Sequence, residues 1–153
     1  MMLTKKVVGN LKNAIESDLL AISIGVIYLW FGSLKFFPAL SPAENLAKNT
    51  IHELTFGLIA DSKSIILLAI LEVGIGILLL LKLWRKTTIV VALFHMALTF
   101  TPLLLFPLDS FKEPPLIPTL LGQYIGKNFV IVAALVTMVK KDPLEKKTLT
   151  NKS

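Results

Sequence analysis

Residues 65–84 read IILLAILEVGIGILLLLKLW, an apolar stretch with one acidic residue, Glu72, near its middle. An α-helix of this length rises about 30 Å, which matches the hydrocarbon core of a bilayer. Lys82 lies near one end, where its amine can reach the lipid headgroups. A carboxylate at mid-membrane is costly unless it is paired or protonated, so Glu72 needs partners from elsewhere in the chain. The stretch therefore predicts a transmembrane helix that carries a buried polar group.

The composition of the whole chain also indicates a membrane protein. Of its 153 residues, 54% are hydrophobic and 17% are charged, and the mean hydropathy is +0.74. Soluble domains have fewer apolar and more charged residues. The absence of cysteine excludes disulfides, thiol redox chemistry and iron–sulfur or other Cys-ligated metal sites. The net charge of +6 does not indicate nucleic-acid binding, because the basic residues flank apolar segments and form no stripe interleaved with aromatic residues.

Three other apolar segments are long enough to cross a bilayer, so we expect an all-α membrane protein. Its fold is a four-transmembrane-helix bundle with spans at about 19–37, 65–84, 87–106 and 120–139. Residues 1–142 form a single membrane domain that begins with a short amphipathic lead-in. Residues 143–153 are expected to be a polar cytoplasmic tail.

Between the first two spans, the sequence predicts a short amphipathic helix over 42–56. Ser41 suits the N-cap, Pro42 the first helical position and Glu44 the reciprocal hydrogen bond of a capping box. The apolar residues that follow share one stripe, but the segment is too short and too polar to span. We expect this helix to lie flat on the membrane surface or to cap the bundle.

Between the third and fourth spans, residues 107–118 are rich in proline. Proline lacks a backbone donor and interrupts helices. The run EPPLIP at 113–118 is therefore expected to be extended, with its leucine and isoleucine packed onto the bundle.

The distribution of lysine and arginine predicts the topology. In the four-span arrangement, eleven of these residues fall on the side that holds both termini and the 82–86 turn, against three on the other side. Basic residues favour the cytoplasmic side. Both termini should therefore be cytoplasmic.

Each predicted span carries its polar residues beside small residues, which are typical of helix contacts in membranes. These stripes predict that the polar residues face the interior and share one pocket in the outer half of the bundle. The candidates are Tyr28 and Lys35 in the first span, Glu72 in the second, His95 and Thr99 in the third, and Gln123, Tyr124, Lys127 and Asn128 in the fourth.

Within this pocket, Glu72 and His95 are the candidates for proton transfer, and the other residues are candidates for ligand binding. Side chains on a helix lean toward its N-terminus, so Lys35 and Glu72 lean toward each other. We expect a lysine amine to contact Glu72, and His95 to open onto the same cavity. No metal site is expected, and haem with two histidine ligands is not expected because His52, the only other histidine, lies in the surface helix.

Simpler interpretations of these residues remain open. Lys35 alone can extend its amine to the headgroups, and a pair of Glu72 with a lysine can serve only to fix the register of the helices. His95 alone is more often a hydrogen-bonded core histidine than a ligand.

Four segments of the chain resemble the DoxX-like family of small bacterial integral membrane proteins. They are FGSLKFFP at 31–38, SPAENL at 41–46, LEVGIGILLLL at 71–81 and GQYIGKN at 122–128. The resemblance covers about residues 28–139 and implies a four-helix bundle in the bacterial cytoplasmic (inner) membrane. Gly32, Lys35, Glu72 and Gly76 match by position, and Gln123, Tyr124 and Lys127 match more loosely. Some relatives accompany quinol oxidase or thiosulfate-oxidising complexes, and others associate with redox-stress enzymes.

These observations favour an accessory subunit of a quinone-linked or redox-stress membrane complex. A quinone site needs an apolar slot with a few hydrogen-bond donors. The chain is at most an accessory subunit of an oxidoreductase, because electrons would come from a partner. The alternatives are a small proton- or cation-coupled transporter that uses Glu72, and a structural or assembly protein without a catalytic role. Besides the lipid bilayer, a redox-enzyme partner or a homo-oligomer is expected.

Overall fold

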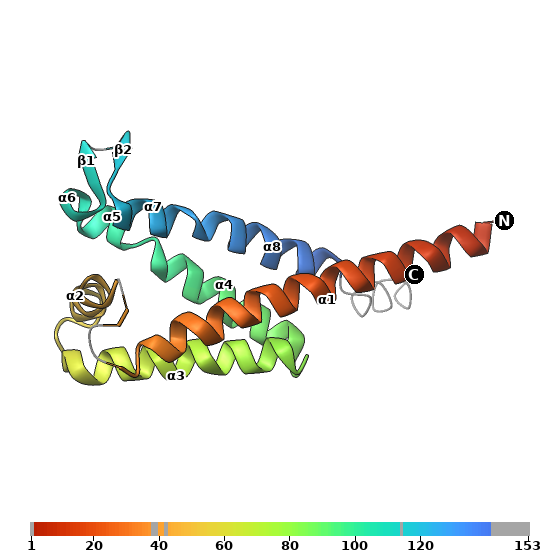
Figure 1. The fold of residues 1–153 in the computed structure, drawn as a ribbon, viewed down its shortest axis with the longest axis horizontal. Coiled ribbons are helices and arrows are strands. Elements are labelled where there is room, and N and C mark those ends of the chain that lie inside the picture. Colours follow the sequence, from red (N-terminus) through yellow and green to blue (C-terminus); the bar gives the residue numbers. More distant parts are fainter. Residues whose placement is uncertain (1, 38–39, 42, 114, 142–153) are drawn as a thin grey trace.

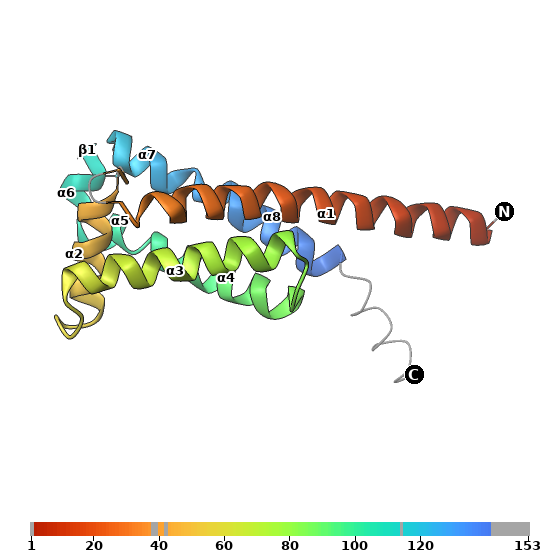
Figure 2. The ribbon, with the colours of Figure 1, turned by 60° about the horizontal axis from the view of Figure 1, so that its bottom comes forward.

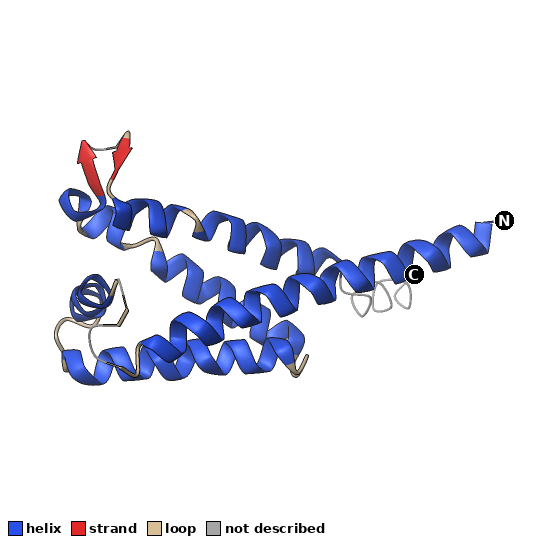
Figure 3. Ribbon diagram, in the orientation of Figure 1, coloured by secondary structure: helices blue, strands red, loops and turns tan. Residues whose placement is uncertain are grey.

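The computed structural model describes residues 2–37, 40–41, 43–113 and 115–141, and the chain is mostly helical (Figures 1 and 3). Among these residues, four helical segments are long and apolar enough to cross a membrane, as predicted. They are Lys12–Leu34, Asp61–Leu80, Arg85–Leu105 and Leu120–Lys140. The first lies in α1 (Met2–Leu34) and the second is α3 (Asp61–Leu80). The third combines α4 (Arg85–Thr99) with α5 (Pro102–Leu105), and the fourth combines α7 (Leu120–Gly126) with α8 (Asn128–Lys141).

Helix α1 begins before the predicted first span of 19–37 and also ends earlier, at Leu34, so Lys35 lies outside the helix in which it was predicted. No proline occurs before Pro38, so the expected lead-in continues as the same helix, which extends beyond the others (Figure 2). Lys35 lies just after the helix end, in a turn closed by a hydrogen bond of 3.1 Å from its backbone N–H to the carbonyl of Gly32. The side chain of Lys35 can therefore turn back toward the bundle.

The third and fourth spans are each interrupted once. Pro102 has no N–H to bond the carbonyl of Leu98, and Thr101 occupies that carbonyl through its backbone N–H at 3.1 Å and its hydroxyl at 2.7 Å. In the fourth span, Lys127 separates α7 from α8. Both interruptions lie near the same end of the molecule (Figure 1).

The short helix α2 (Glu44–Leu54) lies across that end (Figure 2). Its N-cap is Ala43, which makes no side-chain cap hydrogen bond, so the helix begins later than predicted and without the expected cap at Ser41. Pro42 lies outside the described residues. Glu44 pairs with Lys48 one turn on, at 2.6 Å.

The proline-rich segment forms α6 (Pro107–Ser110) and a hairpin of β1 (Phe111–Glu113) and β2 (Ile117–Pro118). The hairpin projects away from the helices (Figure 1), and Leu116 and Ile117 are 85% and 47% exposed. The prediction that these two side chains pack on the bundle is wrong. Pairing between the two strands satisfies backbone groups within the hairpin, so its tip can stand clear of the apolar core, while the base of the segment packs against α7.

Helices α1 and α3 pack through glycines. A Cβ on Gly76 would lie 2.9 Å from both the carbonyl oxygen of Gly25 and the backbone nitrogen of Leu29. A Cβ on Gly32 would lie 2.9 Å from the Cβ of Glu72. This close approach places the end of α1 beside Glu72.

At the other end of the α1–α3 contact, ion pairs connect α1 with the turn that follows α3 and with the start of α4. The carboxylate of Asp18 on α1 accepts hydrogen bonds from Lys82 at 2.7 Å and from Arg85 at 2.9 Å. Between the two ends lies an apolar core from four helices, made of Ala21, Ile24, Tyr28, Ile75, Leu79, Ile89, Ala92, Met96, Leu135 and Met138.

Candidate functional site

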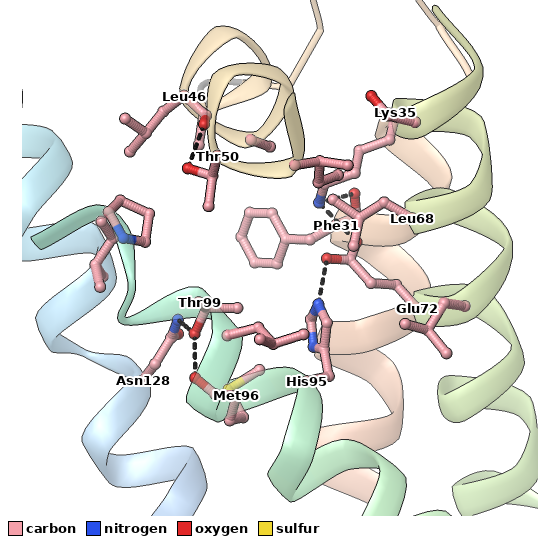
Figure 4. Close-up of a pocket in the computed structure, with 18 of the residues that line it drawn as sticks. Phe31, Lys35, Leu46, Thr50, Leu68, Glu72, His95, Met96, Thr99 and Asn128 are labelled. Atoms are coloured by element: carbon pink, nitrogen blue, oxygen red, sulfur yellow. Dashed lines mark hydrogen bonds and ion pairs between the residues drawn. The ribbon is translucent and has the colours of Figure 1, made fainter. Parts of the chain in front are cut away.

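A cavity of about 350 Å³ lies beneath α2, between α1, α3 and the interrupted third and fourth spans (Figure 4). Most of its lining is apolar. The polar side chains that line it are Tyr28, Lys35, Thr50, Ser64, Glu72, His95, Thr99, Tyr124 and Asn128.

Lys35 and Glu72 form an ion pair on one wall of the cavity. The amine of Lys35 lies 2.6 Å from Oε2 of Glu72, and the two side chains are only 9% and 10% exposed. The predicted contact between a lysine amine and Glu72 is therefore confirmed. Removing one member of such a pair would leave an uncompensated buried charge.

His95 extends this pair into a chain of four side chains. Its Nε2 lies 3.4 Å from Oε1 of Glu72, and its Nδ1 lies 3.0 Å from the hydroxyl of Tyr28. Glu72 thus lies between Lys35 and His95, one at each carboxylate oxygen. The prediction that His95 opens onto the same cavity is confirmed.

The opposite wall carries a second polar group. The amide nitrogen of Asn128 donates to the hydroxyl of Thr99 at 3.1 Å, and that hydroxyl donates to the carbonyl of Met96 at 2.7 Å. The ring of Phe31 lies between this wall and the Lys35–Glu72 pair (Figure 4). Tyr124 packs edge-on against Phe31, with ring centroids 5.8 Å apart. The cavity therefore has polar groups on two sides of an apolar middle.

Two predicted site residues lie elsewhere. Gln123 and Lys127 are exposed and do not line the cavity, so the prediction that they face the common pocket is wrong. The inward face of the fourth span runs through Tyr124 and Asn128, one position further along the chain. One residue turns a helix by about 100°, which is enough to move a side chain from the interior to the surface.

Other lining residues were not identified as site residues from the sequence. Nothing in the sequence marked Phe31 as a site residue, because an aromatic side chain in an apolar run is typical of any transmembrane helix. Leu46, Thr50 and Leu54 lie on the predicted apolar stripe of α2 and line the cavity. The stripe was detectable, but the sequence left open whether it faces lipid or the bundle.

In the described part of the chain, no group of three or more histidine, aspartate or glutamate residues is placed to hold a metal ion. The side chains of the cavity can instead donate hydrogen bonds to an organic head group and exchange protons with it. No protein-family model, curated protein or solved structure matches the chain.

Proposed function

We propose that the chain is a DoxX-like membrane subunit whose cavity binds a quinone or a similar lipid-soluble ligand. The observation that carries this proposal is the apolar cavity with the Lys35–Glu72–His95 group on one wall and the Thr99–Asn128 pair on the other. The resemblance of four segments to DoxX-like proteins also supports it.

The volume and polarity of the cavity suit a quinone ring. Such a ring is flat and apolar, with carbonyl oxygens at opposite edges that accept hydrogen bonds. The Lys35 amine and the Asn128 amide are donors on opposite walls, and Phe31 lies between them. Small-molecule sites have volumes of roughly 300–1,000 Å³, so the cavity is large enough for a ring with its substituents.

We propose a corresponding placement in the bacterial inner membrane. The four candidate spans form a bundle in the bilayer, with both termini and the basic turn at Lys82–Lys86 on the cytoplasmic side. Helix α2 is then an amphipathic helix at the outer surface, above the cavity. In any redox reaction of the ligand, the lining side chains exchange the protons and a partner enzyme supplies or removes the electrons.

Binding of 2-methoxy-1,4-naphthoquinone to the protein in lipid nanodiscs tests the proposal. Isothermal calorimetry, with empty nanodiscs as the blank, should give saturable binding. Asn128→Leu removes one donor from the cavity, and loss of one hydrogen bond should weaken binding about three- to tenfold. Gln123→Leu is the matched control, because it makes a similar change outside the cavity and should leave the affinity unchanged. Equal affinities of the two variants, or no saturable binding, would contradict the proposal.

A further inference from the structure

The hydroxyl of Tyr28 lies between two hydrogen-bond acceptors. It is 3.0 Å from Nδ1 of His95 and 3.4 Å from the backbone carbonyl oxygen of Ala92. Tyr28 and His95 are 3% and 4% exposed, so bulk water does not replace either contact. A hydroxyl hydrogen can rotate toward either acceptor without movement of the heavy atoms.

In this arrangement, both ring nitrogens of a neutral His95 have hydrogen-bond partners. The carboxylate of Glu72 only accepts hydrogen bonds, so the Nε2 that faces it at 3.4 Å carries a hydrogen. The Nδ1 of a neutral ring is then an acceptor, and the Tyr28 hydroxyl donates to it.

The same arrangement also gives both ring nitrogens of a positively charged His95 a hydrogen-bond acceptor. A second proton on Nδ1 turns that nitrogen into a donor, and the oxygen of Tyr28 accepts from it. The hydroxyl hydrogen of Tyr28 then points to the carbonyl of Ala92. Both protonation states therefore keep all of their hydrogen bonds, as buried polar groups generally require.

The charges around His95 indicate which kind of ligand would favour the doubly protonated ring. The described titratable groups that face it are Tyr28 and Lys35 from the α1 side and Glu72 from α3, with Tyr124 of α7 on the same cavity. Helices α2 and α8 contribute only the neutral Thr50 and Asn128 to the polar lining. Lys35 and Glu72 cancel each other, so an anionic head group that enters the cavity brings a negative charge that nothing balances.

We propose that His95 takes up one proton from the aqueous phase when an anionic head group, such as an ionised hydroxyquinone, binds in the cavity. Tyr28 is the positioning residue that makes both states of His95 acceptable. This inference rests on the proposed function, and it adds that the site favours acidic quinone-type ligands and couples their binding to proton uptake.

Two probes that differ in charge test the inference. 2-Hydroxy-1,4-naphthoquinone is an anion at neutral pH, and 2-methoxy-1,4-naphthoquinone is its neutral counterpart. Calorimetry in buffers of different ionisation enthalpy should show uptake approaching one proton for each anion bound. Because each anion bound takes up a proton, the affinity for the anion should fall by up to about tenfold for each unit of rising pH. The neutral probe should show no uptake and no pH dependence.

Two variants of the cavity test whether the proton that is taken up binds to His95. His95→Gln keeps an amide that can donate to Glu72 but cannot take up a proton, so uptake and pH dependence should both be lost. Binding of the neutral probe to the same variant is measured alongside, and the loss of affinity should be larger for the anion, because only the anion needs the second proton on His95. Tyr28→Phe should weaken binding of the anion about three- to tenfold more than binding of the neutral probe, since the charged His95 loses its partner. Proton uptake that persists in His95→Gln would overturn the inference.

A spectroscopic readout does not depend on variants of the cavity. The chain has two histidines, so His52→Gln leaves His95 as the only one. Imidazole ¹⁵N spectra should show a hydrogen on one ring nitrogen in the free protein and on both nitrogens with the anionic probe. An unchanged spectrum with the anion bound would overturn the inference and leave the proposed function standing. Failure of both probes to bind would overturn both.

Discussion

Replacing Gly76 by valine should separate α1 from α3 and cost about 3 kcal/mol or more of the free energy of unfolding. The Cβ alone would lie 2.9 Å from backbone atoms of Gly25 and Leu29, and backbone atoms cannot move aside as the end of a flexible side chain can. The measurement is unfolding of the detergent-solubilised protein by sodium dodecyl sulfate, followed by circular dichroism.

Gly74→Val is the matched control for this change. Gly74 lies on the same helix two residues earlier, and nothing lies within 4 Å of a Cβ built there. The control should change the free energy of unfolding by less than about 1 kcal/mol, since the added side chain meets open space. Equal losses for the two variants would show that the close approach of α1 and α3 does not stabilise the fold.

Removing only one partner of the Lys35–Glu72 pair should be far more harmful than removing both. Lys35→Met removes the ion-pair partner of the buried Glu72 carboxylate and leaves His95 as its remaining described side-chain partner. Breaking the pair in this way should lower the free energy of unfolding by about 3–5 kcal/mol. Adding Glu72→Leu removes the uncompensated charge, and the double variant should recover most of that loss, because apolar replacement of a buried pair is often tolerated.

Lys127→Met controls for the loss of a lysine, because Lys127 is exposed and outside the cavity. The free energy of unfolding of this variant should stay within about 0.5 kcal/mol of that of the parent chain. If Lys35→Met lowers the free energy of unfolding no more than this control, the ion pair has no energetic role.

The stable double variant also separates two roles of the pair. A purely structural pair predicts that it still binds 2-methoxy-1,4-naphthoquinone, whereas a ligand site predicts weaker binding.

The four apolar spans and the Lys35–Glu72 contact could be predicted because each depends on properties that are local in the sequence. The length of an apolar run can be read directly from the sequence, and the lean of Glu72 along its helix depends only on the direction of the chain. Lys35 lies in the turn after α1 and not within the helix, so the contact was predicted correctly although the lean expected for Lys35 does not apply. The pocket wall formed by Tyr28, Glu72 and His95 followed from placing three such helices at comparable depth.

The errors have a common physical origin in choices that depend on neighbouring elements. The fourth span offered two adjacent faces, 123/127 and 124/128, and small residues lie beside both. Only packing against α1 and α4 selects Asn128, which bonds Thr99 across the gap. The apolar stripe of α2 likewise fits a lipid surface or the roof of a cavity equally well. Pairing of β1 with β2 depends on contacts between strands rather than on the proline pattern that was visible in the sequence.

Photoaffinity labelling with an azido-quinone in the intact membrane tests whether the cavity is a quinone site. After digestion and mass spectrometry, the label should fall on peptides that line the cavity, within residues 43–54 of the α2 region or residues 95–102. An excess of 2-methoxy-1,4-naphthoquinone should remove it. A label found only on outward-facing residues such as Trp30, Phe94 or Phe129, and unaffected by the competitor, would contradict a quinone site in this cavity.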